Sequence, residues 1–107
     1  MEFKNNQPIY IQIADHFYEQ ILTGSWETGD KLPSVREVAV SLEVNPNTAI
    51  RAYELLQNQE VIYNKRGIGY FVAEDSYQKV LNLKRDEFKR VVLPNIFKQM
   101  ALLKISI

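Results

Sequence analysis

Two helix-start signals stand only eleven positions apart, and this spacing constrains the fold more than any other feature of the sequence. Ser34 and Glu37 form a capping-box pattern, in which each side chain accepts a hydrogen bond from the backbone amide of the other residue. Asn45 followed by Pro46 marks a second start, with a capping side chain and a proline in the first helical turn. The space between the two signals holds one short helix and a tight turn at Glu43-Val44. Two helices joined in this way form a helix-turn-helix.

A further helix precedes this unit and a hairpin follows it. Pro8 opens a pattern of apolar residues at spacing four, which Gly24 ends, namely Ile9, Ile13, Phe17 and Ile21. The second helix of the unit continues to about Gln59. Two strand-like runs, residues 61–64 and 70–73, then enclose a basic loop with two glycines, which is typical of a β-hairpin. A hairpin directly behind a helix-turn-helix predicts a winged helix.

The sequence after the hairpin is helical again. From Asp75 onward, apolar residues recur at alternating spacings of four and three, which is the pattern of a coiled-coil seam, and Pro94 marks a boundary between two helices. A small domain cannot bury all of this surface, so we expect a dimerisation tail that uses Tyr77, Leu81, Lys84, Phe88, Val91, Ile96, Phe97, Met100 and Leu103. The alternative is a tail that folds back on the first helix. The predicted fold class is α+β, mostly α: a winged helix-turn-helix domain of three helices and a hairpin over residues 1–74, then a two-helix tail over residues 75–107.

The composition excludes several classes of protein. A chain of 107 residues holds one compact domain with at most a small appendage. It has no cysteine, which excludes a disulfide scaffold, a thiolate zinc site and a cysteine nucleophile. No nucleophile–base pair, metal cluster or phosphate-cradling loop stands out, so we expect neither an enzyme nor a metal site nor a cofactor. The single histidine, His16, is expected to be structural or at the surface, and Trp26 to pack at the junction of the helices.

The net charge of zero hides an uneven distribution of charge. Residues 1–30 carry one basic and five acidic side chains, a balance of −4, whereas residues 31–73 have a balance of +1 and residues 74–107 a balance of +3. A partner responds to the local potential rather than to the sum, so neutrality does not exclude nucleic acid. The sequence also shows no signal-peptide pattern and no apolar run near the ~20 residues of a membrane span. We therefore expect a cytoplasmic protein without a membrane partner.

The predicted helix-turn-helix has polar residues where DNA would be read. The second helix of such a unit enters the major groove, and its N-terminal residues reach base edges. Asn, Thr and Arg side chains suit that role because they offer matching donors and acceptors. The start of the preceding helix suits phosphate contacts, and a basic hairpin tip with glycines suits the minor groove. Double-stranded DNA is therefore the predicted partner, contacted through Ser34, Arg36, Asn45, Asn47, Thr48, Arg51, Lys65, Arg66, Gly67 and Gly69.

Each of these residues also has an ordinary explanation. Ser34 and Asn45 would cap a helix in any protein, and a lone Arg51 is usually a solvated surface residue. Two basic residues at a hairpin tip commonly protect a sheet edge. DNA binding is favoured because all of these features fall where one duplex can touch them together. The alternative is a protein-interaction module built on a winged helix, and steep salt dependence of DNA binding would separate the two.

Four short motifs follow one another over residues 7–73. They read Pro8-Ile-Tyr10-x-Gln12-Ile, Gly29-Asp-Lys31-Leu-Pro33-Ser34-x-Arg36-Glu37-x-Ala39, Val44-Asn45-Pro46-Asn47-Thr48-x-x-Arg51-Ala52-Tyr53-x-x-Leu56 and Arg66-Gly67-x-Gly69-x-Phe71-Val72. In these motifs the chain resembles the GntR family of bacterial transcription regulators. In its short length it resembles the YtrA-type subgroup of that family. The resemblance implies a winged helix that binds operator DNA as a homodimer and usually represses transcription. It also implies DNA contacts by Arg36, Asn45, Asn47, Thr48, Arg51, Arg66, Gly67 and Gly69.

The sequence departs from the family's pattern at several places. Glu60 stands where relatives often have Gly, so that helix end carries another cap or an unfavourable left-handed residue. Tyr70 replaces a common Thr in the wing, which adds an expected stacking or phosphate contact with DNA. Relatives outside the subgroup have Arg at the positions of Pro46 and Ile50, so their base contacts do not transfer. The 34 residues after the wing are too few for the large effector domain of many relatives, and no residue pattern points to a small-molecule effector.

Overall fold

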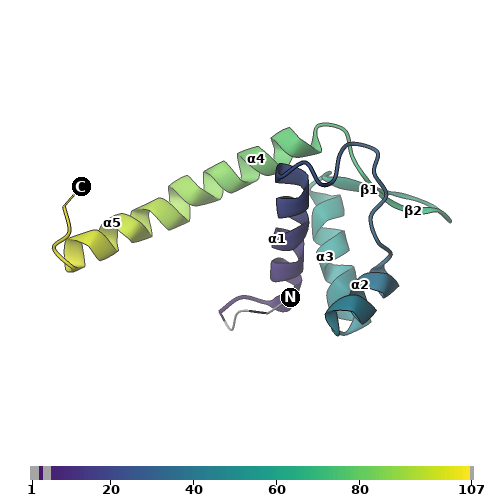
Figure 1. The fold of residues 1–107 in the computed structure, drawn as a ribbon, viewed down its shortest axis with the longest axis horizontal. Coiled ribbons are helices and arrows are strands. Elements are labelled where there is room, and N and C mark those ends of the chain that lie inside the picture. The colour runs from purple at the N-terminus through teal and green to yellow at the C-terminus, as the bar shows by residue number, and fades with distance from the viewer. Residues whose placement is uncertain (1–2, 4–5, 107) are drawn as a thin grey trace.

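A three-helix bundle carries a β-hairpin on one side and a long helical tail on the other (Figure 1). The computed structural model describes residue 3 and residues 6–106, so the outer ends of the two predicted domains, residues 1 and 107, lie outside the described residues. The elements follow the order α1 (Ile9–Leu22), α2 (Val35–Leu42), α3 (Pro46–Asn58), β1 (Ile62–Lys65), β2 (Gly69–Val72), α4 (Ser76–Glu87), the π-helix η1 (Phe88–Val92) and α5 (Leu93–Leu102). This order confirms the predicted fold class, a mostly helical winged helix with a helical tail.

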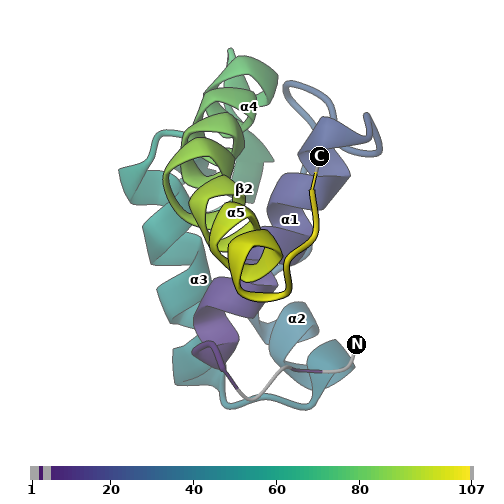
Figure 2. The same cartoon turned by 90° about the vertical axis from the view of Figure 1, so that its left-hand side faces the viewer.

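The core of the bundle is built around an aromatic side chain of α3. Tyr53 is the largest fully buried side chain, and its hydroxyl donates a hydrogen bond to the carbonyl oxygen of Pro33, just before α2. Its ring meets Phe17 of α1 edge-on at 5.5 Å between centroids and Tyr70 of β2 at 4.8 Å. Trp26 packs on Phe17 at 5.0 Å, which is the junction role that the sequence predicts. One residue of α3 therefore joins α1, the start of α2 and the wing; Figure 2 shows α1 and α3 side by side.

Both helix starts of the helix-turn-helix are capped as predicted. The Glu37 amide donates to Ser34 Oγ at 3.0 Å, and the Ser34 amide donates to Glu37 Oε1 at 3.3 Å, which completes the capping box. At the start of α3, the Asn47 amide donates to Asn45 Oδ1 at 2.8 Å. Between them, Glu43 ends α2 in the left-handed conformation, with φ of 56°. The local hydrogen bonds of these caps fix where the chain enters each helix.

The wing contains a third extended segment that the sequence did not reveal. β1 and β2 pair in antiparallel register with Tyr63 opposite Phe71. On its other edge, β2 is flanked by the segment before α2, where Lys31 forms a bridge with Phe71 and the Leu32 amide donates to the Tyr70 carbonyl oxygen at 2.9 Å. The hairpin is thus held along its second strand by the same segment that leads into α2. The position of the wing is therefore coupled to the position of the helix-turn-helix.

The tail is packed onto the bundle at its first turns. Ser76 and Val80 of α4 are fully buried. The Ser76 hydroxyl lies 2.6 Å from the carbonyl oxygen of Val61 and 2.5 Å from that of Ala73, so it holds the helix start against the end of the wing. A buried polar group with its partners in place fixes one geometry, because any displacement leaves it unsatisfied.

One turn further along, a lysine joins α4 to α1. Lys84 Nζ lies 3.1 Å from both Asp15 Oδ1 and Glu87 Oε2, and 5.5 Å from the centre of the Tyr18 ring. Partial burial lowers the pKa of Lys84, but its hydrogen bonds to the two carboxylates outweigh that effect, and the pKa is raised above its ordinary value. Tyr18 in turn donates a hydrogen bond to Gln59 at the end of α3. The first three turns of the tail are therefore fixed to α1, which is itself joined to the end of α3.

Beyond this contact the tail runs on as one rod, and the helix boundary predicted at Pro94 is confirmed, since α5 begins at Leu93. The chain passes from α4 through the five-residue π-helix η1 directly into α5, where Pro94 occupies the first turn. A proline ring clashes with the carbonyl group four residues earlier in an α-helix, whereas the wider π-turn removes that clash. None of the side chains of α5, all of which the structure describes, is buried. Within the described part of the chain, no helix combines the length and apolar character needed to cross a membrane.

Glu60 occupies the left-handed conformation after α3, with φ of 60°, which is the unfavourable alternative named for this position. Glu60→Gly is expected to raise the free energy of unfolding by about 1 kcal/mol, because glycine adopts this conformation without a Cβ clash. The hydrogen bond from Lys79 Nζ to the residue-60 carbonyl oxygen at 3.0 Å is retained, since it involves the backbone. Urea denaturation measures the change. Glu60→Ala serves as the control, because it removes the carboxylate but keeps the strain, and an equal gain in both variants would contradict this explanation.

Candidate nucleic-acid interface

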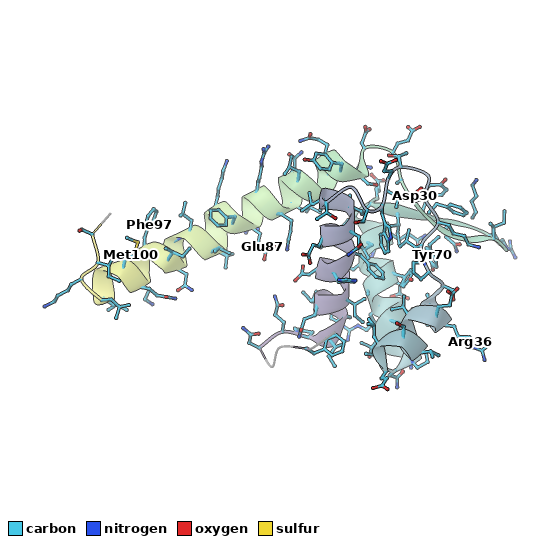
Figure 3. The ribbon with its side chains drawn as sticks, in the orientation of Figure 1. Asp30, Arg36, Tyr70, Glu87, Phe97 and Met100 are labelled. Atoms are coloured by element: carbon cyan, nitrogen blue, oxygen red, sulfur yellow. The ribbon has the colours of Figure 1, made fainter. Side chains whose placement is uncertain are left out.

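The predicted DNA-contacting segments lie on one side of the bundle, away from the tail. Figure 3 shows Arg36 projecting from the start of α2 toward the side on which the hairpin extends, while Phe97 and Met100 lie at the far end of the rod. The segment of Lys31 and Leu32 lies between these two features and connects them. The start of α2 and the wing therefore face outward together, as a duplex would require.

The two capping residues among the predicted contacts have their side-chain oxygens occupied. Ser34 Oγ accepts from Glu37, and Asn45 Oδ1 accepts from Asn47. Both side chains thus perform the capping role that was their ordinary explanation, and a DNA contact by either side chain stays a prediction. Asn47 is exposed and Thr48 half-buried in the first turn of α3. The backbone amides of Asn47, Thr48 and Ala49 all donate to Asn45, so this first turn offers its polar side chains and its positive dipole end rather than free amides.

Arg51 has an intramolecular partner that the sequence did not indicate. Its guanidinium carbon lies 4.1 Å from the centre of the Tyr10 ring, near the start of α1. A guanidinium stacked on an aromatic face keeps its hydrogen-bond donors free at the edge of the plane. Tyr10 therefore holds an exposed Arg51 in one direction, so that its charge is already placed when a partner arrives.

The wing tip presents basic and apolar groups together. Lys65 Nζ lies 5.0 Å from the centre of the Phe71 ring, and Arg66 is exposed at the tip. Ile68, which is not among the predicted DNA contacts, is 60% exposed between the positive-φ residues Gly67 and Gly69. Exposed apolar side chains such as this one are suited to a minor groove, where DNA-binding proteins insert them between base steps.

Lys31 is a second residue at this surface that the sequence patterns do not indicate. A Cβ atom built on Gly69 would lie 3.0 Å from Lys31 Cε, so the lysine side chain runs directly over the glycine at the base of the wing tip. The positive charge of Lys31 therefore lies at the same hairpin as those of Lys65 and Arg66. A pattern-based search cannot find this residue, because the contact depends on the pairing of Lys31 with Phe71.

Tyr70 packs on the core rather than standing free. Its ring lies 4.8 Å from that of Tyr53 and is half-buried. The structure thus gives Tyr70 a packing role, and its contact with DNA stays a prediction.

The apolar residues predicted to form a dimer contact lie mostly at the surface of the tail. Leu81 and Met100 are half-buried, and Lys84 faces α1 through its ion pair with Asp15. The remaining members are exposed to between 40% and 68%, namely Tyr77, Phe88, Val91, Ile96, Phe97 and Leu103. Lys84 is therefore already paired with a carboxylate of its own chain. The members of this set in η1 and α5, by contrast, make few contacts with the rest of the chain.

A family model described as "Bacterial regulatory proteins, gntR family" matches residues 9–72, from the start of α1 to the end of β2. The chain belongs to the GntR family. The HTH-type transcriptional repressor YtrA of Bacillus subtilis is 34% identical over 94 residues, which are 84% of this chain and 72% of that protein. This relative also agrees with the YtrA-type resemblance seen in the sequence.

Two solved structures extend the comparison. A GntR family transcriptional regulator from Listeria monocytogenes superposes with a TM-score of 0.81 at 42% identity, covering 97% of this chain and 90% of that one. The DNA-binding domain of AraR, solved in complex with operator ORX1, gives a TM-score of 0.63 at 26% identity, covering 67% of this chain and 93% of that one. The first comparison includes the tail, and the second concerns the winged helix.

Gly69→Ala is expected to weaken DNA binding several-fold, because the wing of this GntR protein would lose its shape. A side chain at φ of 143° is strained, at a cost of about 1–3 kcal/mol, and the new Cβ would displace Lys31. Fluorescence anisotropy with labelled operator DNA measures the affinity. Gly24→Ala is the matched control, since it has similar backbone strain, with φ of 82°, and no neighbour within 4 Å of the new Cβ. Equal affinities of the two folded variants would argue against a role of the wing.

Proposed function

We propose that this GntR protein is a cytoplasmic, homodimeric repressor that binds a pseudo-palindromic operator through two winged helices. One observation carries the proposal: the capped helix-turn-helix and the basic wing lie on one side of the bundle, and the exposed apolar rod extends from the other (Figure 1). A duplex and a second protomer can therefore be bound at once without competing for the same surface.

The proposed DNA contacts follow from the geometry of the winged helix. The first turn of α3 enters the major groove, where Asn47 and Thr48 contact base edges and Arg51 contacts a base edge or phosphate. Arg36 contacts the backbone from the start of α2. The wing tip, with Lys65, Arg66 and the newly found Lys31, follows the adjacent minor groove, and its glycines permit close approach. Ser34, Asn45, Gly67 and Gly69 contribute through backbone groups.

The proposed dimer forms through the tail. Exposed large apolar side chains continue along it from Phe88 to Ile105, and α5 buries none of them within its own chain. Contiguous apolar surface of this kind marks a protein interface in soluble proteins. A second copy of the same chain fits best, because two-fold symmetry places two recognition helices on two half-sites. The printed name of YtrA, a transcriptional repressor, supports repression as the outcome of operator binding.

Selection of bound DNA from a random pool tests the proposal. The expected result is a pseudo-palindrome with half-sites about one helical turn apart, centre to centre. Affinity for that site should fall steeply with salt, because phosphate contacts release counterions. Recovery of no common sequence, together with weak salt dependence, would contradict the proposal and support the alternative of a protein-interaction module. A common sequence without symmetry would contradict the dimer alone.

A further inference from the structure

A pocket lies between α1, the loop after it and α2, and it borders the start of α2 next to the proposed DNA contacts Ser34 and Arg36. Its volume is about 340 Å³, within the range of about 300–1,000 Å³ that small-molecule sites occupy. Its floor is apolar and is formed by the buried side chains of Phe17 and Val38 together with the half-buried side chains of Trp26 and Leu42. Polar groups reach it only from the exposed rim, through His16, Glu37 and Ser41.

The charge at this rim is negative. Glu37 takes part in none of the ion pairs found within residue 3 and residues 6–106, so its carboxylate has no cationic partner there. Its charge is felt nearby: burial raises the pKa of Tyr53, and the neighbouring Glu37 carboxylate raises it further. Among the lining residues that the structure describes, Glu37 is the one that is an Asp, Glu, Lys or Arg. The field around the pocket therefore favours a cation.

We infer that this pocket binds a small organic ammonium compound with an apolar, preferably aromatic, body. The ammonium group pairs with the Glu37 carboxylate, while the body covers Val38 and Leu42 on the floor. The indole ring of Trp26 stacks tilted on Phe17 at 5.0 Å, so an aromatic wall borders the same space. Such a wall attracts both an apolar body and a cation.

Occupation of the pocket is coupled to α2 through the residue that would hold the ligand. Glu37 Oε1 accepts from the Ser34 amide and so closes the capping box at the start of α2, beside Arg36. An ammonium group that draws the carboxylate toward the pocket weakens this cap. We therefore expect the ligand to lower the affinity for operator DNA, and by linkage DNA to lower the affinity for the ligand by the same factor. This second part rests on the proposed function, whereas ligand binding to the free protein does not.

The test uses the full chain and three probes of similar shape: phenethylamine, the neutral phenethyl alcohol and the anionic hydrocinnamate. Trp26 is the single tryptophan, so its fluorescence reports binding in the pocket. Phenethylamine is expected to bind at least about ten-fold more tightly than either other probe, the factor that one charge-assisted hydrogen bond supplies. Glu37→Gln is expected to remove that advantage and leave the alcohol unaffected. Glutamine still closes a capping box, so the fold is kept.

Two further measurements make the result decisive. Ser41→Phe fills the pocket from its rim and is expected to abolish the response to all three probes without loss of helical circular dichroism. Equal affinities of the three probes, or no binding of phenethylamine, would overturn the inference about the ligand. Operator affinity is measured first without a probe, which tests the proposed function separately. Saturating phenethylamine is then expected to lower it about five-fold or more; binding of the probe with unchanged operator affinity would overturn the coupling.

Discussion

Phe97→Asp is expected to leave the protein monomeric and to lower its affinity for an operator with two half-sites by about 100-fold or more. Phe97 is 48% exposed in α5 and belongs to the apolar surface that we propose as the dimer contact. A carboxylate there would have to be buried without a partner when two rods meet, which is strongly unfavourable. Once the dimer is lost, each half-site is bound separately, and the second binding event is no longer intramolecular. Sedimentation equilibrium and fluorescence anisotropy measure the two effects.

Asn95→Asp is the matched control for this substitution. It adds the same charge to the same helix, but Asn95 precedes Phe97 by two residues and so lies on nearly the opposite face. Asn95→Asp is expected to remain dimeric and to bind the operator with little change. A Phe97→Asp protein that remains dimeric would contradict the proposed dimer contact and favour dimerisation through the bundle.

Arg36→Ala is expected to lower the affinity of the proposed dimer for every DNA sequence by about 100-fold, because each protomer would lose the proposed charge-assisted contact with phosphate. The change removes contacts with the DNA backbone and not with bases, so the preferred sequence should stay the same. The slope of log affinity against log salt should fall by about two for the dimer, one for each lost phosphate contact. Anisotropy titrations at several salt concentrations, with operator and unrelated DNA, measure these quantities.

Lys98→Ala is the control for the charge itself. Lys98 is exposed in α5, far along the rod from the wing, and its removal changes the net charge by the same amount. Little change in operator affinity is expected. If both alanine variants lost affinity equally, binding would depend on the overall charge of the protein, and the proposed DNA-binding face would be wrong.

The features that the sequence predicted correctly are those set by neighbouring residues. The caps at Ser34 and Asn45 are satisfied within three residues, so the starts of α2 and α3 follow from local hydrogen bonding. The left-handed residue at Glu60 is another local feature. The helix boundary at Pro94 follows from the same local logic, because proline fits the first turn of α5, whereas the π-helix that precedes it was not predicted.

The features that could not be predicted depend on contacts between distant parts of the chain. The bridge of Lys31 with Phe71 adds an extended segment to the edge of the two-stranded wing and brings Lys31 to the base of its tip. The ring of Tyr10 under Arg51 likewise joins α1 to α3. Periodicity and capping patterns contain no information on which residues of separate elements meet. The candidate DNA-binding residues could therefore be named from sequence, but not the partners that orient them.

The packing of α4 on α1 has a consequence for the DNA that this protein can recognise. Ser76, Val80 and Lys84 fix the rod to the bundle. The winged helix is therefore joined to the proposed dimer contact without a flexible linker. One base pair inserted between the half-sites rotates them by about 34° relative to each other, and this rigid connection has no joint to absorb the rotation. Natural target sites of the protein should therefore share one spacer length, while the base composition of the spacer is free to vary.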